Sequence, residues 1–356
     1  MRIGVDARPL SVPTFGIGRY TRELLERLIV LAPEHDWFLY ADRPIFDPPI
    51  SKNVTLRSFS QHNRIFSLAR TQFTFSHWAE LDKLDLYWSP RHHLPLFLNR
   101  RIKQLVTVHD MVWKKYPQTM QAMNLFVEGL LMPTSLRNAD KIIAVSNATK
   151  RDLVETLAII DDKVEVIHEA AGVLRDVDPF REIEAEYFFF VGTHEPRKNL
   201  DRLLEAFQIY QSSGGRLQLV IAGAEGWGAG GHIDGGSGVQ SLGYVSDERL
   251  NGLMTHAHAL VFPSLYEGFG LPLLESIQRG VPVITSNVSS MPEVAGDAGL
   301  FVDPLNVDSI AGGMLTMAAP GKRKIFSRKC DAQLKLFSWD KSAKLTLEVI
   351  ENLVQP

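Results

Sequence analysis

The chain of 356 residues has a single cysteine, Cys330, so it cannot form an internal disulfide, which is typical of a reducing compartment. It also has no basic excess. Its 38 Lys and Arg stand against 41 Asp and Glu, so we do not expect nucleic acid as the main partner. No stretch reaches the roughly 18 apolar residues of a membrane span, and the start MRIGVDARPL lacks the apolar run of a signal peptide. We expect a cytosolic protein, and peripheral membrane contact stays open.

Short apolar runs recur along the whole chain with helix-like segments between them. Most are continuous rather than alternating, which is typical of parallel strands buried on both faces. The pattern predicts an α/β protein. Twelve such strands would be many for one open sheet, and a single core rarely exceeds about 250–300 residues, so we expect two domains of six strands each. The runs are residues 2–7, 37–41, 84–89, 104–109, 141–146 and 164–169, then 187–192, 217–223, 239–245, 259–264, 281–286 and 299–304.

The polar segment 171–186 has no strand pattern and is the candidate boundary. We therefore predict an N-terminal domain over 1–170 and a C-terminal domain over 171–337, both doubly wound and Rossmann-like. The last segment, 338–356, has helical spacing, and it either remains on the second domain or crosses back to the first. Doubly wound sheets bind ligands outside the carboxyl ends of their strands, so we expect the two domains to face each other across a cleft.

Two features of the first half follow strand ends. In FGIGRYTRELLERL (15–28), Gly16 and Gly18 precede an amphipathic helix, where backbone can approach an anionic ligand. The dinucleotide fingerprint fails, because Thr21 stands where its third glycine belongs. A plain glycine entry to a helix fits the same pattern. His109 closes the run 104–109 and can hydrogen-bond a substrate hydroxyl, although a lone histidine is more often structural.

In VGTHEPRKNLDRLLEAF (191–207), Arg197 and Lys198 fall at the expected start of a helix near Asn199. The helix dipole disfavours cations there by about 0.3–1 kcal/mol each, so the placement predicts an anion site. Arginine grips phosphate oxygens bidentately and lysine acts as a point charge. The alternative is a solvated surface pair.

The stretch SLYEGFGLPLLES (264–276) places Glu267 before a glycine turn and Glu275 in the helix that follows. Pro272 suits a first helical turn, and we expect Glu275 in that turn, where a carboxylate is also simply a good helix start. Glu267 has no such explanation. The N–H groups around Phe269–Leu271 can cradle phosphate, and carboxylates beside an anion site suit sugar hydroxyls.

Taken together, these segments resemble the retaining glycosyltransferases of family 4, which have the GT-B fold. The glutamate pair resembles their E-x7-E motif. The resemblance covers most of the chain and extends to EPRKNL, GYVSDERL, GVPVITSNVSSMPEVAGDAGLFVDP and FSWDKSA in the second half, and to the glycine turn, VHDMVW and AVSNATKRDL in the first. Each piece is weak alone, and the combination is specific.

The resemblance implies a role for each site residue. Glu267 would contact the donor sugar, Glu275 the nucleotide ribose, and Arg197 with Lys198 the diphosphate. His109 would lie near the anomeric carbon. Backbone would assist at Gly16 and Gly18 near the diphosphate, at Gly243 and Tyr244 near the base, and at the turn Gly268, Phe269, Gly270 and Leu271. Many relatives have Gly-Arg where this chain has Gly192-Thr193, so one cation is missing and Arg197 and Lys198 would carry more of the charge.

We expect no cofactor and no metal in this chemistry. Asp176-Val177-Asp178 imitates a metal-binding pair but follows no strand. The glycine-rich residues 223–238 precede a strand rather than a helix, so we interpret them as a loop near the cleft rather than a phosphate cradle.

By the resemblance, the protein is a hexosyltransferase. Its partners would be a nucleotide-sugar donor, with mannose from GDP-mannose the first choice, and a glycan or lipid-linked acceptor in cell-surface polysaccharide synthesis. Basic and aromatic residues mix over 91–103 and 111–117, which suits either an anionic membrane or a solvated loop. A non-hydrolysing nucleotide-sugar epimerase and a non-catalytic nucleotide-sugar-binding protein are the alternatives.

Overall fold

The computed structural model of the chain describes residues 1–12, 16–59, 67–172, 180–226 and 237–355. These residues form two compact units. Unit 1 comprises Met1–Lys115, Ala122–Glu169 and Ser338–Pro356, and unit 2 comprises Tyr116–Gln121 and Ala170–Phe337. The division falls between Glu169 and Ala170, and the last segment of the chain returns to unit 1. The assignment of Tyr116–Gln121 to unit 2 has no signal in the sequence pattern. The ring of Tyr116 lies 5.6 Å from that of Tyr266.

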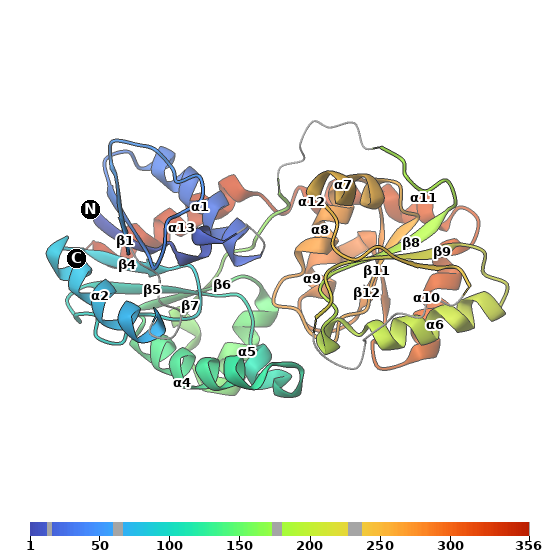
Figure 1. Cartoon of the computed structure of the whole chain (residues 1–356), viewed down its shortest axis with the longest axis horizontal. Helices are drawn as coiled ribbons and strands as arrows, with labels where there is room; N and C mark the ends of the chain where they lie inside the picture. Colours follow the sequence, from blue (N-terminus) through green and yellow to red (C-terminus); the bar gives the residue numbers. More distant parts are fainter. Residues whose placement is uncertain (13–15, 60–66, 173–179, 227–236, 356) are drawn as a thin grey trace. The chain divides into compact units, whose positions relative to one another are not determined.

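The sheet of unit 1 has seven strands in the order β3-β2-β1-β4-β5-β6-β7, all pairs parallel (Figure 1). The six predicted strands are present, but the expected count of six is wrong, because β3 was missed. Its residues VTLRS are largely exposed at the sheet edge, so they carry no continuous apolar run. The strands are β1 (Arg2–Asp6), β2 (Asp36–Ala41), β3 (Val54–Ser58), β4 (Leu86–Ser89), β5 (Lys103–Val108), β6 (Lys141–Ala144) and β7 (Val164–Val166).

The sheet of unit 2 has the predicted six strands in the order β10-β9-β8-β11-β12-β13, again all parallel. Its central strand β8 is buried over Tyr187–Phe190, as expected for a strand covered on both faces. The strands are β8 (Tyr187–Val191), β9 (Gln218–Ala222), β10 (Val239–Ser241), β11 (Ala259–Phe262), β12 (Val283–Ser286) and β13 (Gly299–Val302).

Helices cover both faces of each sheet (Figure 1). In unit 1, α1 and α13 lie on one face while α4 and α5 lie on the other. In unit 2, α6 packs beside α10, and α8 lies beside α12. The helices of unit 1 are α1 (Ile17–Leu31), α2 (Ser67–Leu81), α3 (Val112–Lys115), α4 (Ala122–Asn138), α5 (Asn147–Leu157) and α13 (Trp339–Val354). Those of unit 2 are α6 (Leu200–Ser212), α7 (Asp247–Thr255), α8 (Leu271–Gln278), α9 (Met291–Ala295), α10 (Val307–Ala318), α11 (Lys322–Ser327) and α12 (Cys330–Leu334).

Several helices begin at side chains that the sequence supplies for the purpose. Ser146 accepts a hydrogen bond from Thr149 N at the start of α5, and Asn306 does the same for Ser309 N at α10. Ser338 caps α13, the helix that returns the chain to unit 1. Such caps satisfy N–H groups that have no partner within the helix and contribute about 0.5–2 kcal/mol each.

The order of strands reverses once in each sheet, between β1 and β4 and between β8 and β11. Ligands of doubly wound folds bind at this reversal, outside the carboxyl ends of the strands. The topology therefore directs attention to the loops after β8 and β11 in unit 2, and to those after β1 and β4 in unit 1.

Candidate active site

The loop after β8 carries the two predicted cations at the reversal point of unit 2. The sequence pattern predicted that Arg197 and Lys198 begin a helix, and this prediction is wrong. They lie in a short 3-10 turn, Pro196–Lys198, and α6 starts only at Leu200. Asn199 separates the two elements in the left-handed conformation, with φ 62°. Its buried side chain donates to Pro263 O at 3.0 Å and Pro304 O at 2.7 Å, so the turn is anchored beside the end of β11.

Glu267, in the loop after β11, joins both cations. One carboxylate oxygen lies 2.7 Å from Arg197 Nη1 and the other lies 2.8 Å from Lys198 Nζ. Arg197 also donates to Tyr266 O at 2.8 Å and contacts the carboxylate of Glu195 at 3.4 Å. The side chains of Arg197, Lys198 and Glu267 are 16, 12 and 10% exposed, so the alternative of a solvated surface pair is wrong.

Charge and burial compete at this cluster. Burial alone would raise the pKa of Glu267, but the charges of Arg197 and Lys198 outweigh it and hold the pKa at about 2. Burial lowers the pKa of Lys198, and the neighbouring Arg197 adds to this against the attraction of Glu267. The carboxylate is therefore ionised at neutral pH and balances the charge of the two cations.

The turn from β11 to α8 is held by serines that the sequence analysis did not single out. The hydroxyls of Ser289 and Ser290 donate to the carbonyl of Glu267, and Ser290 Oγ also donates to Phe269 O at 2.8 Å. Gly270 caps α8 with φ 101°, a conformation that favours glycine. The first N–H groups of α8, beginning at Leu271, have no acceptor within the helix. This is the backbone arrangement that suits an oxyanion.

Glu275 is not in the first turn of α8. The helix begins at Leu271, and its first turn contains no acidic residue, so the reading of Glu275 as a helix start is wrong. Glu275 is partly buried in the second turn of α8, and Arg279 Nη1 donates to the backbone carbonyl of Glu275 at 2.5 Å.

Three neighbouring strands of unit 2 end at glycines with positive φ. Gly192 after β8 has φ 148°, Gly223 after β9 has φ 149° and Gly243 after β10 has φ 63°. The three strand ends are joined through the backbone, since Gly223 N donates to Gly243 O at 2.8 Å and Gly192 N donates to Ala222 O at 3.0 Å. A Cβ on Gly223 would lie 1.9 Å from Gly192 O, so only glycine fits there. Beside this edge, Tyr244 is 67% exposed. The edge therefore presents backbone and one aromatic ring.

In unit 1, the predicted glycines bracket the start of α1. Gly16 is the cap residue, with φ 50°, and Gly18 is buried within the first turn rather than before the helix. Tyr20, one turn along, brings its ring to 4.7 Å from that of His109, edge to face.

His109 follows β5 and is 8% exposed. Its Nδ1 lies 2.9 Å from Glu169 Oε1, and its Nε2 lies 2.9 Å from Pro90 O. Both partners are acceptors when Glu169 is ionised, whereas a neutral imidazole has one N–H to donate. Both ring nitrogens of His109 are therefore already engaged by groups of unit 1. The expected hydrogen bond from His109 to a substrate hydroxyl therefore requires the ring to give up its contact with either Glu169 or Pro90 O.

Two charged groups of unit 1 were not identified from the sequence. His92 Nε2 accepts from His109 N at 3.1 Å, while its Nδ1 lies 3.3 Å from Glu128 Oε2 on α4. Burial opposes protonation of His92, but Glu128 outweighs it and raises the pKa of His92. The second group is Asp6 at the end of β1, which pairs with Arg8 at 2.5 Å. In the sequence, the dipeptide His92-His93 was the only feature that pointed to His92.

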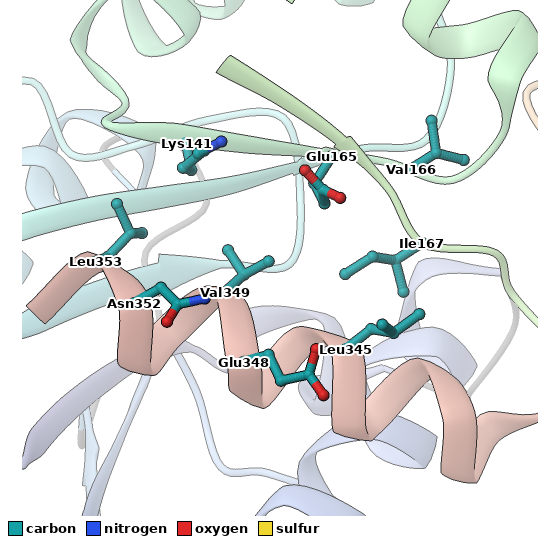
Figure 2. A pocket seen from close by; sticks show the side chains of 9 residues that line it. All are labelled: Lys141, Glu165, Val166, Ile167, Leu345, Glu348, Val349, Asn352 and Leu353. Carbon is teal, nitrogen blue, oxygen red and sulfur yellow. The ribbon is translucent and has the colours of Figure 1, made fainter. Parts of the chain in front are cut away.

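Two predicted features lie outside the described residues: the Asp176-Val177-Asp178 pair and most of the glycine-rich loop, over 227–236. A pocket of about 280 Å³ lies in unit 1 between β7 and α13. Figure 2 shows the side chains of α13 facing the strand across it. None of the predicted site residues lines this pocket.

Comparisons with known proteins identify the family of the chain. Residues 15–170 match the family described as Glycosyltransferase Family 4, and residues 178–324 match Glycosyl transferases group 1. The chain is 31% identical to O-antigen chain mannosyltransferase B of Escherichia coli, covering 99% of this chain and 100% of that protein. It is 27% identical to O-antigen chain mannosyltransferase RfbU of Salmonella typhimurium, covering 65% of this chain and 66% of that protein.

A solved structure, sucrose-phosphate synthase from Thermosynechococcus elongatus, has the same fold. It superposes with a TM-score of 0.75 at 19% identity, covering 99% of this chain and 98% of that chain. The predicted α/β class with two Rossmann-like domains is thereby confirmed. The chain belongs to family 4 of the glycosyltransferases and is a glycosyltransferase of the GT-B fold.

Proposed function

We propose that the protein is a retaining mannosyltransferase that transfers mannose from GDP-mannose to a glycan or lipid-linked acceptor of a cell-surface polysaccharide. The choice of mannose rests on the names of the two O-antigen mannosyltransferases. The placement of the chemistry rests on one observation: the buried cluster of Arg197, Lys198 and Glu267 at the reversal point of the second sheet.

The leaving group of the reaction is a nucleoside diphosphate that gains negative charge as the glycosidic bond breaks. In the proposal, Arg197 and Lys198 meet this charge, together with N–H groups at the start of α8. Groups fixed before the reaction stabilise a developing charge without reorganisation, which is the largest catalytic contribution in many enzymes. No metal or cofactor is part of this proposal, because Arg197, Lys198 and the start of α8 would together balance the charge of the diphosphate.

Glu267 then has two successive roles. Without donor it neutralises the cations, and when the diphosphate arrives it exchanges them for hydroxyls of the donor sugar. Glu275 takes the ribose, and Gly243 and Tyr244 meet the base. His109 acts in unit 1 near the anomeric carbon, and Gly16 and Gly18 approach the diphosphate from α1. Retention follows if the acceptor attacks the oxocarbenium-like sugar on the face that the diphosphate leaves, with a phosphate oxygen taking the acceptor proton.

The exchange of partners at Glu267 provides the test. Lys198→Ala removes a charged donor to phosphate, so we expect GDP to bind about 10- to 100-fold more weakly by titration calorimetry. Glu267→Gln removes the competing carboxylate, so GDP binding is expected to be equal or tighter while mannosyl transfer is slowed. Lys324→Ala, an exposed lysine of unit 2, is the matched control. If the Lys198 and Glu267 variants lost GDP affinity equally, Glu267 would only position the cations. The proposed exchange of Glu267 from the cations to the donor sugar would then be refuted.

The donor and the rival functions are separated in the same assay. UDP- and ADP-sugars tested beside GDP-mannose, with and without Mg²⁺, identify the base and the metal requirement. Product analysis without acceptor then excludes or establishes an epimerase, which converts its donor alone. Tight GDP binding without any transfer and without any donor hydrolysis would indicate a binding protein.

A lipid-linked acceptor is supported by an apolar face in unit 1. Met123, Phe126 and Leu130 follow each other along α4 at helical spacing and are 71, 68 and 59% exposed. Exposed apolar groups also lie on the adjoining segments, where Phe73 of α2 stacks on Phe97 at 4.5 Å. Residues 94–100 lie against α4 through Leu94 N to Ser135 Oγ and Arg100 to Asn138, at 2.9 and 2.7 Å.

Exposed cations also occur in unit 1, among them Arg100, Arg101, Lys103 and Lys114. Apolar side chains beside cations suit an anionic lipid surface, and each cation near such a surface contributes about 1 kcal/mol. Among the helices of the described residues, none is long and apolar enough to cross a membrane. The exposed apolar side chains of α4 and the cations of unit 1 are the basis on which we propose contact with the surface of a bilayer.

Co-sedimentation with vesicles tests this contact. The protein should bind vesicles that contain phosphatidylglycerol and not vesicles of phosphatidylcholine alone. The double variant Phe126→Ser, Leu130→Ser should lose most of the binding. Val30→Ser on α1, where the side chain is 78% exposed, is the control. Unchanged sedimentation of the double variant would show that α4 is not the contact.

A further inference from the structure

Three side chains meet on unit 1 where the turn between α1 and β2 lies beside α13. Glu34 and His35 belong to the turn, and Glu351 belongs to the last turns of α13. One ligand atom from each lies within 4.8 Å of the other two. We name these three residues the α13 cluster. It plays no part in the donor chemistry proposed above.

His35 is the unusual member of the cluster. It is 6% exposed, and both of its ring nitrogens are buried without a hydrogen-bond partner. Nδ1 is 3.5 Å from Glu34 Oε1 and Nε2 is 3.4 Å from Glu351 Oε1. A buried polar atom left without a hydrogen bond costs about 1–3 kcal/mol, so two on one ring call for a partner.

The backbone holds this ring in place independently of any ligand. His35 N donates to Ala32 O at 3.2 Å, and Asn53 Nδ2 donates to His35 O at 2.9 Å. The backbone position of His35 beside the carboxylates is therefore fixed by these two bonds. Glu34 is 62% exposed and Glu351 35%, so both carboxylates have room to adjust to a ligand.

An imidazole nitrogen with two carboxylate oxygens is a donor set for a divalent transition metal. Zinc binds such ligands at about 2.0–2.2 Å with tetrahedral geometry, which separates neighbouring ligand atoms by about 3.3 Å. The gaps of 3.5 Å from Nδ1 to Glu34 and 3.4 Å from Nε2 to Glu351 are too long for good hydrogen bonds. One ligand atom from each residue lies within 4.8 Å of the other two, so the two carboxylates would close on one nitrogen of His35 to complete the site. We propose that the α13 cluster binds Zn²⁺, with Glu34, one nitrogen of His35 and Glu351 as ligands and water in the remaining position.

The location indicates a structural rather than a catalytic metal. His35 directly precedes β2, so the cluster lies at the amino edge of the first sheet, whereas ligands bind at the carboxyl edge. The metal would fasten the far end of α13, whose near end is joined to α1 by Arg27 Nε and Asp340 at 2.7 Å. It would thus secure the segment that returns the chain to unit 1.

Calorimetric titration of chelator-treated full-length protein with ZnCl₂ is the primary test. We expect saturable binding at one site and a rise in the melting temperature, because a ligand of the folded state stabilises it by mass action. His35→Gln and Glu351→Gln should each weaken Zn²⁺ binding at least tenfold. Glu348→Gln, which removes the same charge one turn earlier on α13, should leave it unchanged. Mg²⁺ should not substitute, since imidazole is a poor ligand for it.

Co²⁺ used as a probe gives a second readout, because its visible absorption reports nitrogen and oxygen ligands directly. The bands should appear in the wild type and in Glu348→Gln and disappear in His35→Gln. Absence of saturable Zn²⁺ binding, or binding that survives in Glu351→Gln, overturns the proposal. The proposal is also overturned if Zn²⁺ leaves the stability unchanged while His35→Gln changes how stability depends on pH. That result would assign the cluster to an imidazolium held between two carboxylates. Mannosyl transfer in metal-free buffer is expected to persist, so this test and that of the donor site fail independently.

Discussion

Replacement of Glu267 by glutamine is the sharpest test of the electrostatics described for the donor site. The substitution keeps the shape of the side chain and removes the charge that balances Arg197 and Lys198. The pKa of Glu267 is about 2 against an ordinary 4.5, because the two cations outweigh the effect of burial. At about 1.4 kcal/mol per pKa unit, this difference corresponds to about 3 kcal/mol of stability at pH 7.

The sign of the pH dependence follows from the lowered pKa. A carboxyl group with a lowered pKa in the folded state stabilises fully above its unfolded pKa, and this stabilisation is lost as pH falls through the folded value. The difference between wild type and Glu267→Gln should therefore be full above about pH 5. By pH 3 it should have fallen to about half, and it should approach zero near pH 2.

Urea denaturation followed by circular dichroism at pH 7, 5, 4 and 3 measures this difference. Because the chain has two compact units, the unfolding of unit 2 must be fitted as its own transition. Glu205→Gln on the exposed face of α6 is the control, with an expected effect below about 0.5 kcal/mol at every pH. A difference below 1 kcal/mol at pH 7, or one that does not change with pH, would refute the buried ion cluster.

Three further substitutions test packing around the site by the same denaturation assay. Asn199→Ala loses two buried hydrogen bonds and strains φ at 62°, so we expect a loss of about 2–4 kcal/mol, with Asn199→Gly recovering only the backbone part, about 1 kcal/mol. Equal losses in the two variants would contradict this division. Gly223→Ala would place a methyl group 1.9 Å from Gly192 O and should cost more than about 3 kcal/mol, whereas Gly312→Ala, with nothing within 4 Å, should be neutral or stabilising. Tyr210→Phe removes the buried acceptor of two backbone N–H groups at 3.1 and 3.2 Å and should cost about 1–3 kcal/mol, a prediction that fails if the variant unfolds with the wild type.

The sequence was sufficient for the strands that are buried on both faces, because a continuous apolar run has no other stable place in a domain of this class. It was not sufficient for β3, whose exposed residues at the sheet edge resemble a loop. Local spacing also misplaced Arg197, Lys198 and Glu275 relative to their helices. A 3-10 turn and a left-handed Asn199 separate the cations from α6, and these features depend on contacts with Pro263 and Pro304.

By itself, the sequence determined the α/β class, the two Rossmann-like halves and the segments that carry the donor chemistry, since these depend on periodicity and on motifs within short windows. Only the tertiary structure decided which charges meet. Glu267 lies 69 residues from Lys198, His109 lies 60 residues from Glu169, and His35 meets Glu351 from the opposite end of the chain. Such pairs are made by the order of strands in the sheets and by the return of α13. Their energies depend on burial, which no local pattern specifies.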